Sequence, residues 1–243
     1  MQWTSPLTKF GRSALVPEGP WSYAFDAIAV HAVANPDRLK NITELKTDGE
    51  MWIYFADIIS HSPNFPQLNY ETPQLVQYKE VAFFIKIEFE GKSYAYCPFM
   101  YVDNDVSLMR GYIVGFPKKI ASIGITRDHP LMKQKIFGAN AMRAGYSLIR
   151  AKVEVEEKAK SLPLDNFGTW ILRRYIGLMG IDELIEFVPE VEYEYIYRGK
   201  ATLEIGGGIN DELEFFKPEK ILEGYRYSAL LKVKDIRVLK SEK

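Results

Sequence analysis

Residues 81–102 read VAFFIKIEFEGKSYAYCPFMYV, and this stretch predicts a β-hairpin. Residues 85–90 alternate apolar and charged side chains, which is the two-residue period of a strand with one buried face. Gly91 and Lys92 then make a turn, and residues 93–102 return as the partner strand. The hairpin therefore predicts a fold built mainly on antiparallel strands.

Segments on both sides of the hairpin extend this prediction. Two helices are expected: one over residues 36–42, and one that begins after the N-cap residues Asp103 and Asn104 and ends at Gly115. Apolar runs and alternating stretches predict further strands over residues 24–33, 52–59, 120–126, 146–157, 169–176, 192–198, 202–205 and 225–238. Strands dominate, so we expect a β-rich α+β fold, an antiparallel barrel or sandwich with few short helices.

The composition restricts the class of protein. The 243 residues, 47% of them hydrophobic, can form one core, and no linker divides them, so we expect a single domain over residues 1–243. A formal net charge of −1 gives no electrostatic signature for nucleic acid or an anionic membrane. No window has the run of apolar residues that a membrane-spanning helix needs.

Cysteine and histidine usage argues against a metal site. The lone cysteine, Cys97, excludes an intrachain disulfide framework and a cysteine-based zinc site. The histidines His31, His61 and His129 lack the spacing of metal ligands. A single cysteine fits a reducing compartment, and residues 1–7 show no signal peptide, so we expect a cytoplasmic protein with no bound metal.

Lys118 and Lys119 carry the clearest chemical signal. They follow Gly115, Phe116 and Pro117, between a predicted helix and an apolar strand. Two adjacent lysines usually mark a solvated turn. The alternative is a nucleophilic amine, which has to be neutral, and burial disfavours the charged form of lysine. If Lys118 points into a pocket, Lys119 points away from it, because adjacent side chains of a strand lie on opposite faces.

The segment YVDND at residues 101–105, followed by FPKK at residues 116–119, resembles the acetoacetate decarboxylase family. The motif Gly-Pro-Trp at residues 19–21, Tyr-Glu at residues 70–71 and the segment 200–227 extend the resemblance over nearly the whole chain. It implies the family's cone-like barrel or double-layered sheet. It also implies that no cofactor is needed and that the protein is a homo-oligomer.

The resemblance further implies roles for individual residues. Lys118 corresponds to the Schiff-base nucleophile, and Lys119 to the lysine that tunes it. Glu71 corresponds to a family glutamate on a loop over the lysine and is a candidate for proton transfer; the alternative is an ordinary exposed loop acid. Asp57 is the acid nearest the position of a second family glutamate, either a pocket residue or a structural hydrogen-bonding group. The remaining candidates for substrate binding are Phe116 and Tyr101.

One family feature is missing. Decarboxylases of the family carry an arginine after the Gly-Pro-aromatic motif, thought to meet the substrate carboxylate; that position falls near Asp26, and no arginine lies between Gly19 and Asp37. We expect a Schiff-base lyase acting on a small keto acid, by decarboxylation of acetoacetate or a related β-keto acid through an imine on Lys118. Two alternatives remain open: an imine-dependent aldolase-dehydratase acting on a larger keto acid, and a non-catalytic module that binds keto acids.

Overall fold

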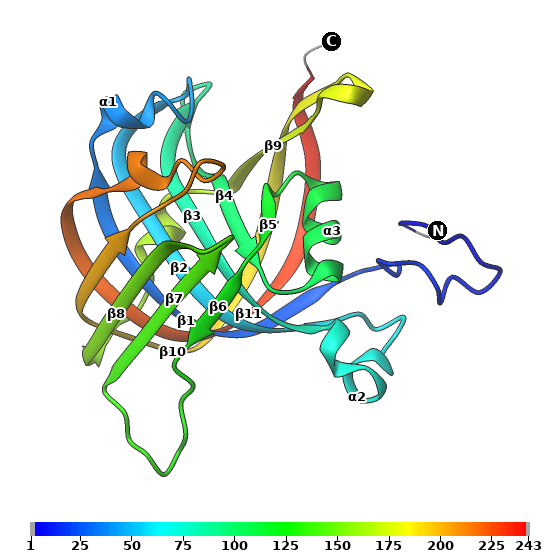
Figure 1. The fold of residues 1–243 in the computed structure, drawn as a ribbon, viewed down its shortest axis with the longest axis horizontal. Coiled ribbons are helices and arrows are strands. Elements are labelled where there is room, and N and C mark those ends of the chain that lie inside the picture. Colours follow the sequence, from blue (N-terminus) through cyan, green and yellow to red (C-terminus); the bar gives the residue numbers. More distant parts are fainter. Residues whose placement is uncertain (1–2, 242–243) are drawn as a thin grey trace.

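The computed structural model describes residues 3–241, and strands dominate it (Figure 1). The strands are β1 (Ser22–Ala34), β2 (Lys46–His61), β3 (Gln77–Phe89), β4 (Lys92–Val102), β5 (Lys118–Ile120), β6 (Ser122–Ile125), β7 (Ile136–Arg143), β8 (Tyr146–Lys158), β9 (Trp170–Ile176), β10 (Ile181–Ile205) and β11 (Pro218–Ser241). The helices are short: α1 (Pro36–Leu39), α2 (Leu68–Glu71), α3 (Asp105–Val114), and the 3₁₀ turns η1 (Pro73–Leu75), η2 (Pro163–Asn166), η3 (Gly177–Met179) and η4 (Leu213–Phe216). The predicted β-rich α+β class is confirmed.

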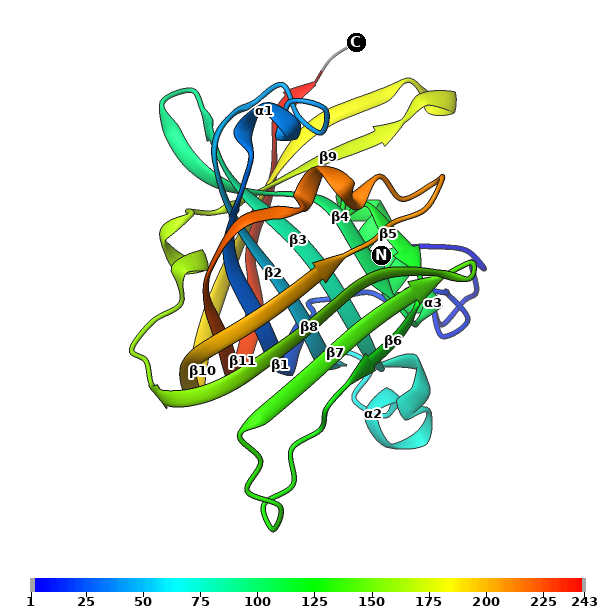
Figure 2. The same cartoon turned by 60° about the vertical axis from the view of Figure 1, so that its left-hand side comes forward.

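The strands form one large sheet that closes on itself. Its order is β11-β1-β2-β3-β4-β9-β10-β8-β7-β6, and β10 also pairs with β11, which closes a ring of seven strands from β11 to β10. Strands β6, β7 and β8 continue beyond β10 and cross the outer face of β1, β2 and β3 (Figure 2). In the ring, β3 and β10 lie on opposite walls, since at least two strands separate them in either direction.

Strands β1, β2 and β3 are buried on both faces. In β2, Ile53 and Phe55 face the core shared with β6, β7 and β8, whereas Tyr54 and Ala56 face the inside of the seven-strand ring. A strand covered on both sides has no need of polar residues, which explains the unbroken apolar run at residues 51–56. This central layer therefore separates two hydrophobic cores.

Helix α3 has the boundaries that the sequence predicts. The Asn104 side chain accepts a hydrogen bond of 2.8 Å from the Ser107 N–H and caps the N-terminus. Gly115 ends the helix in the left-handed region, with φ of 116° and its N–H bound to the Gly111 carbonyl. The chain then turns through Pro117 into β5, which pairs parallel with β4 and brings Lys118 beside Met100.

Some predicted boundaries are wrong. The strand expected over residues 120–126 is interrupted at Ala121, because β5 pairs with β4 and β6 pairs with β7. Strand β7 was not predicted, since its buried positions are mostly alanines, a weak apolar signal. The segments 192–198 and 202–205 belong to one strand, β10.

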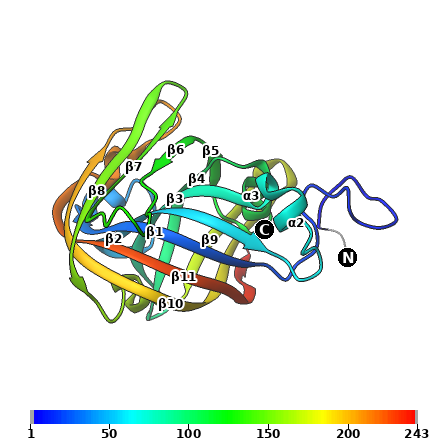
Figure 3. The ribbon, with the colours of Figure 1, turned by 90° about the horizontal axis from the view of Figure 1, so that it is seen from below.

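Helices α2 and α3 and the N-terminal segment gather at one end of the ring (Figures 1 and 3). Helix α2 and the 3₁₀ turn η1 lie between β2 and β3. No helix within residues 3–241 is long and apolar enough to cross a membrane.

Candidate active site

A cavity of about 270 Å³ lies inside the seven-strand ring. Each of the seven strands contributes at least one side chain to its lining, and α3 and β5 add Arg110, Gly111 and Lys118. Enclosed, largely apolar cavities with a few converging polar groups are the usual form of small-molecule sites. The cavity is therefore the candidate active site.

The amine of Lys118 is held by a carboxylate inside this cavity. Its Nζ donates to Glu80 Oε2 at 2.7 Å and to Ser107 Oγ at 3.0 Å. The Lys118 and Glu80 side chains are each only 7% exposed. The second oxygen of Glu80 accepts a hydrogen bond of 2.6 Å from the Tyr54 hydroxyl. A buried amine thus has a proton acceptor in direct contact.

Gly111 leaves the space that Lys118 occupies. A Cβ at this position would lie 2.4 Å from Lys118 Cε and 2.5 Å from its Cδ, closer than carbon atoms approach. The absence of a side chain on this turn of α3 lets the lysine extend along the helix towards Glu80. Gly111 is thus a steric requirement of the site.

Burial keeps the tyrosines of the site protonated. It raises the pKa of Tyr78 to about 12, and the negative charge of Glu80 adds to the effect. The pKa of Tyr54 is raised well above its usual value, first by burial and then by Glu80. Both hydroxyls can therefore act as hydrogen-bond donors up to strongly alkaline pH.

Arg110, on α3, adds a second cation that has no ion-paired carboxylate among residues 3–241, although the negative charge of Glu80 acts on it from a longer distance. The residue is 3% exposed; its guanidinium donates to Ser60 Oγ at 3.3 Å and to the Tyr78 hydroxyl at 3.4 Å. Its Cζ lies 4.4 Å from the centre of a Trp21 ring and 5.0 Å from that of Tyr23. Within residues 3–241, no acid forms an ion pair with it. A buried charge without a partner is costly, so the site favours an anionic ligand.

The predicted site residues divide between the two faces of β4 and β5. Lys118 and Phe116 line the cavity. Lys119 pairs in register with Tyr101, and both contact Asp211 on the opposite face: Lys119 Nζ lies 2.9 Å from Asp211 Oδ1, and the Tyr101 hydroxyl donates to the same oxygen at 2.9 Å. Lys119 and Tyr101 thus lie outside the cavity, as strand alternation requires.

The two predicted acids also lie away from Lys118. Glu71 is exposed at the end of α2 and does not line the cavity. Asp57 is half-buried and pairs with Arg127 Nε at 2.9 Å. Asp26, where a carboxylate-binding arginine was sought, faces Arg226 at 3.4 Å and is likewise absent from the cavity lining. The acid at the amine is Glu80, and the arginine in the cavity comes from α3.

Sequence reasoning missed Glu80, Arg110 and Ser107, although each leaves a signal. Glu80 interrupts an apolar strand at the buried positions between Tyr78 and Ala82. Ser107 and Arg110 are three residues apart and share one face of α3. A buried acid on a strand and a buried cation on a helix are residues that need partners.

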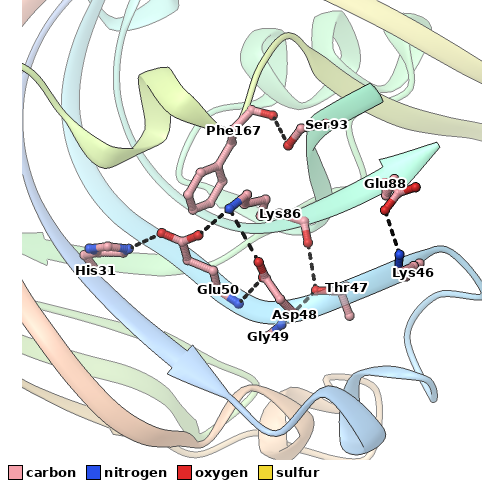
Figure 4. A network of polar contacts seen from close by, with 10 residues as sticks. All are labelled: His31, Lys46, Thr47, Asp48, Gly49, Glu50, Lys86, Glu88, Ser93 and Phe167. Atoms are coloured by element: carbon pink, nitrogen blue, oxygen red, sulfur yellow. Dashed lines mark hydrogen bonds and ion pairs between the residues drawn. The ribbon is translucent and has the colours of Figure 1, made fainter. Parts of the chain in front are cut away.

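A second polar network lies elsewhere on β1, β2 and β3 (Figure 4). His31 Nε2 lies 2.9 Å from Glu50 Oε1, and Lys86 Nζ lies 2.8 Å from Glu50 Oε2. Lys86 also lies 3.4 Å from Asp48. The network joins three neighbouring strands and does not line the cavity. Among the described residues, no group of three or more acids, histidines or cysteines could hold a metal ion.

Comparisons with known proteins match this architecture. A search of the curated proteins finds no match. Among solved structures, an acetoacetate decarboxylase-like enzyme from Sphingomonas wittichii RW1 superposes with a TM-score of 0.92 at 24% identity, covering 100% of both chains. The enduracididine biosynthesis enzyme MppR, complexed with pyruvate, gives 0.89 at 22% identity, covering 99% of this chain and 98% of the other.

An acetoacetate decarboxylase is similar as well. Its TM-score is 0.81 at 17% identity, and the match covers 99% of this chain and 96% of that one. The family model for acetoacetate decarboxylase (ADC) matches residues 4–242, which is nearly the whole sequence and confirms the resemblance seen in its motifs. This chain therefore belongs to the acetoacetate decarboxylase family.

Proposed function

We propose that this protein is a Schiff-base lyase in which Lys118 attacks the ketone of a keto acid whose carboxylate binds Arg110. One observation supports this most strongly: the cavity holds a buried amine in contact with a carboxylate. Beside the same Tyr78 lies a buried guanidinium that has no ion-paired acid among residues 3–241. Arginine forms charge-assisted hydrogen bonds with carboxylates, so a keto acid satisfies both cations at once.

Glu80 moves the proton in this mechanism. It takes a proton from the Lys118 ammonium, to which it is hydrogen-bonded at 2.7 Å, and the free amine adds to the ketone carbon. Glu80 then returns the proton to the carbinolamine hydroxyl, which leaves as water and gives a protonated imine. The Tyr54 hydroxyl fixes Glu80 from its other oxygen at 2.6 Å.

The imine accepts electrons from a neighbouring carbon. In a β-keto acid, the pair of the breaking carbon–carboxylate bond moves into the imine as carbon dioxide leaves. The resulting enamine takes up a proton at carbon, and water hydrolyses the imine to release the ketone and the free Lys118 amine. Decarboxylation of a β-keto acid, the reaction that gives the family its name, is the first candidate.

A second candidate, aldol addition followed by dehydration, has an observation in its favour. A guanidinium that binds the carboxylate stabilises the negative charge of the substrate. As carbon dioxide leaves, that charge moves away from the carboxylate, so the guanidinium stabilises the reactant more than the transition state of decarboxylation. Aldol and dehydration steps keep the carboxylate, so Arg110 stabilises reactant and transition state alike. One relative of known structure, MppR, is complexed with the condensation product of pyruvate and imidazole 4-carboxaldehyde.

Covalent trapping tests the proposal. The protein is incubated with pyruvate or acetoacetate in the presence of borohydride, which reduces an imine to a stable amine, and its peptides are analysed by mass spectrometry. We expect the mass of the reduced ligand on the peptide that contains Lys118. Labelling of another lysine, or of none with either keto acid, would reject the Schiff-base assignment. Carbon dioxide release from acetoacetate and from β-keto acids with longer apolar tails then separates the two reactions.

A further inference from the structure

Apolar residues line every side of the cavity, whereas its charged residues are confined to one side. Within the described chain, its only charged lining residues are Glu80, Arg110 and Lys118, from β3, α3 and β5. The wall formed by η2, β9, β10 and β11 carries no charged residue in contact with the cavity; β10 lies across the ring from β3, and β9 is separated from β3 by β4. The cavity therefore has a reactive pole and an uncharged pole.

The uncharged pole is built from large apolar side chains. It includes Leu164, Trp170, Phe187, Val191, Leu231 and Val233. The phenol of Tyr193 also reaches this wall, but its hydroxyl donates to Asp165 Oδ1 at 2.6 Å and is already satisfied. Apart from the phenol of Tyr227 on β11, a ligand group placed here meets apolar surface.

We propose that the substrate is a keto acid with a bulky, uncharged, apolar substituent, aliphatic or aromatic, that lies against this wall. The proposal rests on the proposed function in placing the carboxylate at Arg110 and the ketone at Lys118. An apolar substituent gains free energy by leaving water for the wall, whereas a second carboxylate would lose its hydration without a cation to replace it. Keto diacids are therefore poor ligands, and acetoacetate, whose tail is a methyl group, leaves the wall unfilled.

The route to the solvent is apolar as well. Trp3 and Ile236 line the cavity while remaining 40% and 41% exposed, so they mark its opening. A substituent too long for the wall would extend between these two side chains. The side chains at the opening therefore present no polar barrier to a long substituent.

Equilibrium binding of simple carboxylates tests the proposal without requiring imine formation. Calorimetric titrations use propanoate, butanoate, pentanoate, hexanoate and 3-phenylpropanoate, with glutarate as the dianion that matches pentanoate in length. We expect affinity to rise along the aliphatic series by up to about fourfold per methylene, with 3-phenylpropanoate among the tightest ligands. Glutarate should bind no better than propanoate. Equal affinities along the series, or glutarate equal to pentanoate, would overturn the proposal.

Two variants of β11 locate the effect. Val233→Trp fills the space at the wall and should reduce hexanoate affinity at least tenfold, whereas Val238→Trp, on the same strand but 49% exposed and outside the cavity lining, should leave it unchanged. Equal effects of the two would overturn the assignment of the wall. Val233→Leu gives a milder form of the same test, and the titrations of the parent decide the proposal by themselves. Borohydride trapping is a separate readout, so a failure of the Schiff base is distinguishable from a failure of the apolar subsite.

Discussion

Lys118 and Lys119 are neighbours in the chain, yet their amines bind carboxylates on opposite faces of β5. Lys118 Nζ lies 2.7 Å from Glu80 Oε2 inside the cavity, and Lys119 Nζ lies 2.9 Å from Asp211 Oδ1 on the other face. Asp211 follows the glycine-rich loop after β10 and also accepts a hydrogen bond from the Tyr101 hydroxyl. The two lysines therefore have separate partners: Lys119 anchors this loop, and the chemical role that we propose belongs to Lys118 alone.

Lys119→Met should retain imine trapping at Lys118. The variant removes one of the partners of Asp211, so we expect a loss of about 1–3 kcal/mol in the free energy of unfolding, measured by urea denaturation. Lys119→Arg keeps the positive charge and should lose less stability than Lys119→Met. Abolished trapping in a folded Lys119→Met protein would instead support the tuning role that the family resemblance implies for Lys119.

Lys118→Met should abolish trapping and also destabilise the fold. It leaves the Glu80 carboxylate buried without its cation, and breaking a buried ion pair from one side typically costs about 3–5 kcal/mol. The double variant Lys118→Met/Glu80→Gln removes both charges and should recover most of that loss. Thermal and urea unfolding at neutral pH measure the three proteins. A single variant as stable as the parent would mean that the pair contributes nothing to folding.

Arg110→Met should weaken the binding of keto acids but not the binding of ketones that lack a carboxylate. A charge-assisted hydrogen bond contributes about 1.5–3 kcal/mol, so the concentration of pyruvate that gives half-maximal trapping should rise roughly 10- to 150-fold. Acetone, which has the ketone but no carboxylate, should be trapped as efficiently by the variant as by the parent. Arg110→Lys keeps a point charge, so its half-maximal pyruvate concentration should lie between those of the parent and Arg110→Met. An equal loss for acetone and pyruvate would show that Arg110 acts only through its packing against Trp21.

Tyr78 should make the free energy of unfolding depend on pH in the alkaline range. Burial raises its pKa in the folded protein to about 12, from an ordinary value of 10.0. Between these values the unfolded chain loses the phenol proton and the folded chain keeps it, so stability falls as pH rises from 10 to 12, by up to about 2–3 kcal/mol from this residue.

The comparison of Tyr78→Phe with the parent isolates this effect. We expect the loss of melting temperature between pH 10 and pH 12 to be smaller in Tyr78→Phe than in the parent. Tyr175→Phe removes an exposed phenol, 61% accessible, and should follow the parent. Identical pH profiles for all three proteins would contradict a buried, protonated Tyr78.

Local patterns predicted the elements that contain the site. The alternation at residues 85–90 marked the β3–β4 hairpin, and Asn104 and Gly115 marked the ends of α3, since capping depends on residues within one turn. Strand β2 is buried on both faces, and this likewise leaves an apolar run in the sequence, at residues 51–56. Strand β7 was missed because small alanines fill its inner face.

The partners of Lys118 could not be found in the same way. Glu80 precedes it by 38 residues, and contact between them requires β3, α3 and β5 to converge on the inside of a ring that closes through the β10–β11 pair. The search for an arginine near Asp26 and for an acid at Glu71 or Asp57 followed the positions of the family motif. In this chain the cavity receives its arginine from α3 and its acid from β3.

The sequence by itself determined the β-rich class, the helix that precedes Lys118 and the opposite orientation of the two lysines, because periodicity and capping act over a few residues. Tertiary structure alone decided that Glu80 binds the amine, that no acid of residues 3–241 forms an ion pair with Arg110, and that the wall of η2, β9, β10 and β11 is uncharged. These properties depend on which strands become neighbours when the sheet closes. Burial then converts that proximity into chemistry, since charges removed from water interact strongly with the few groups that remain beside them.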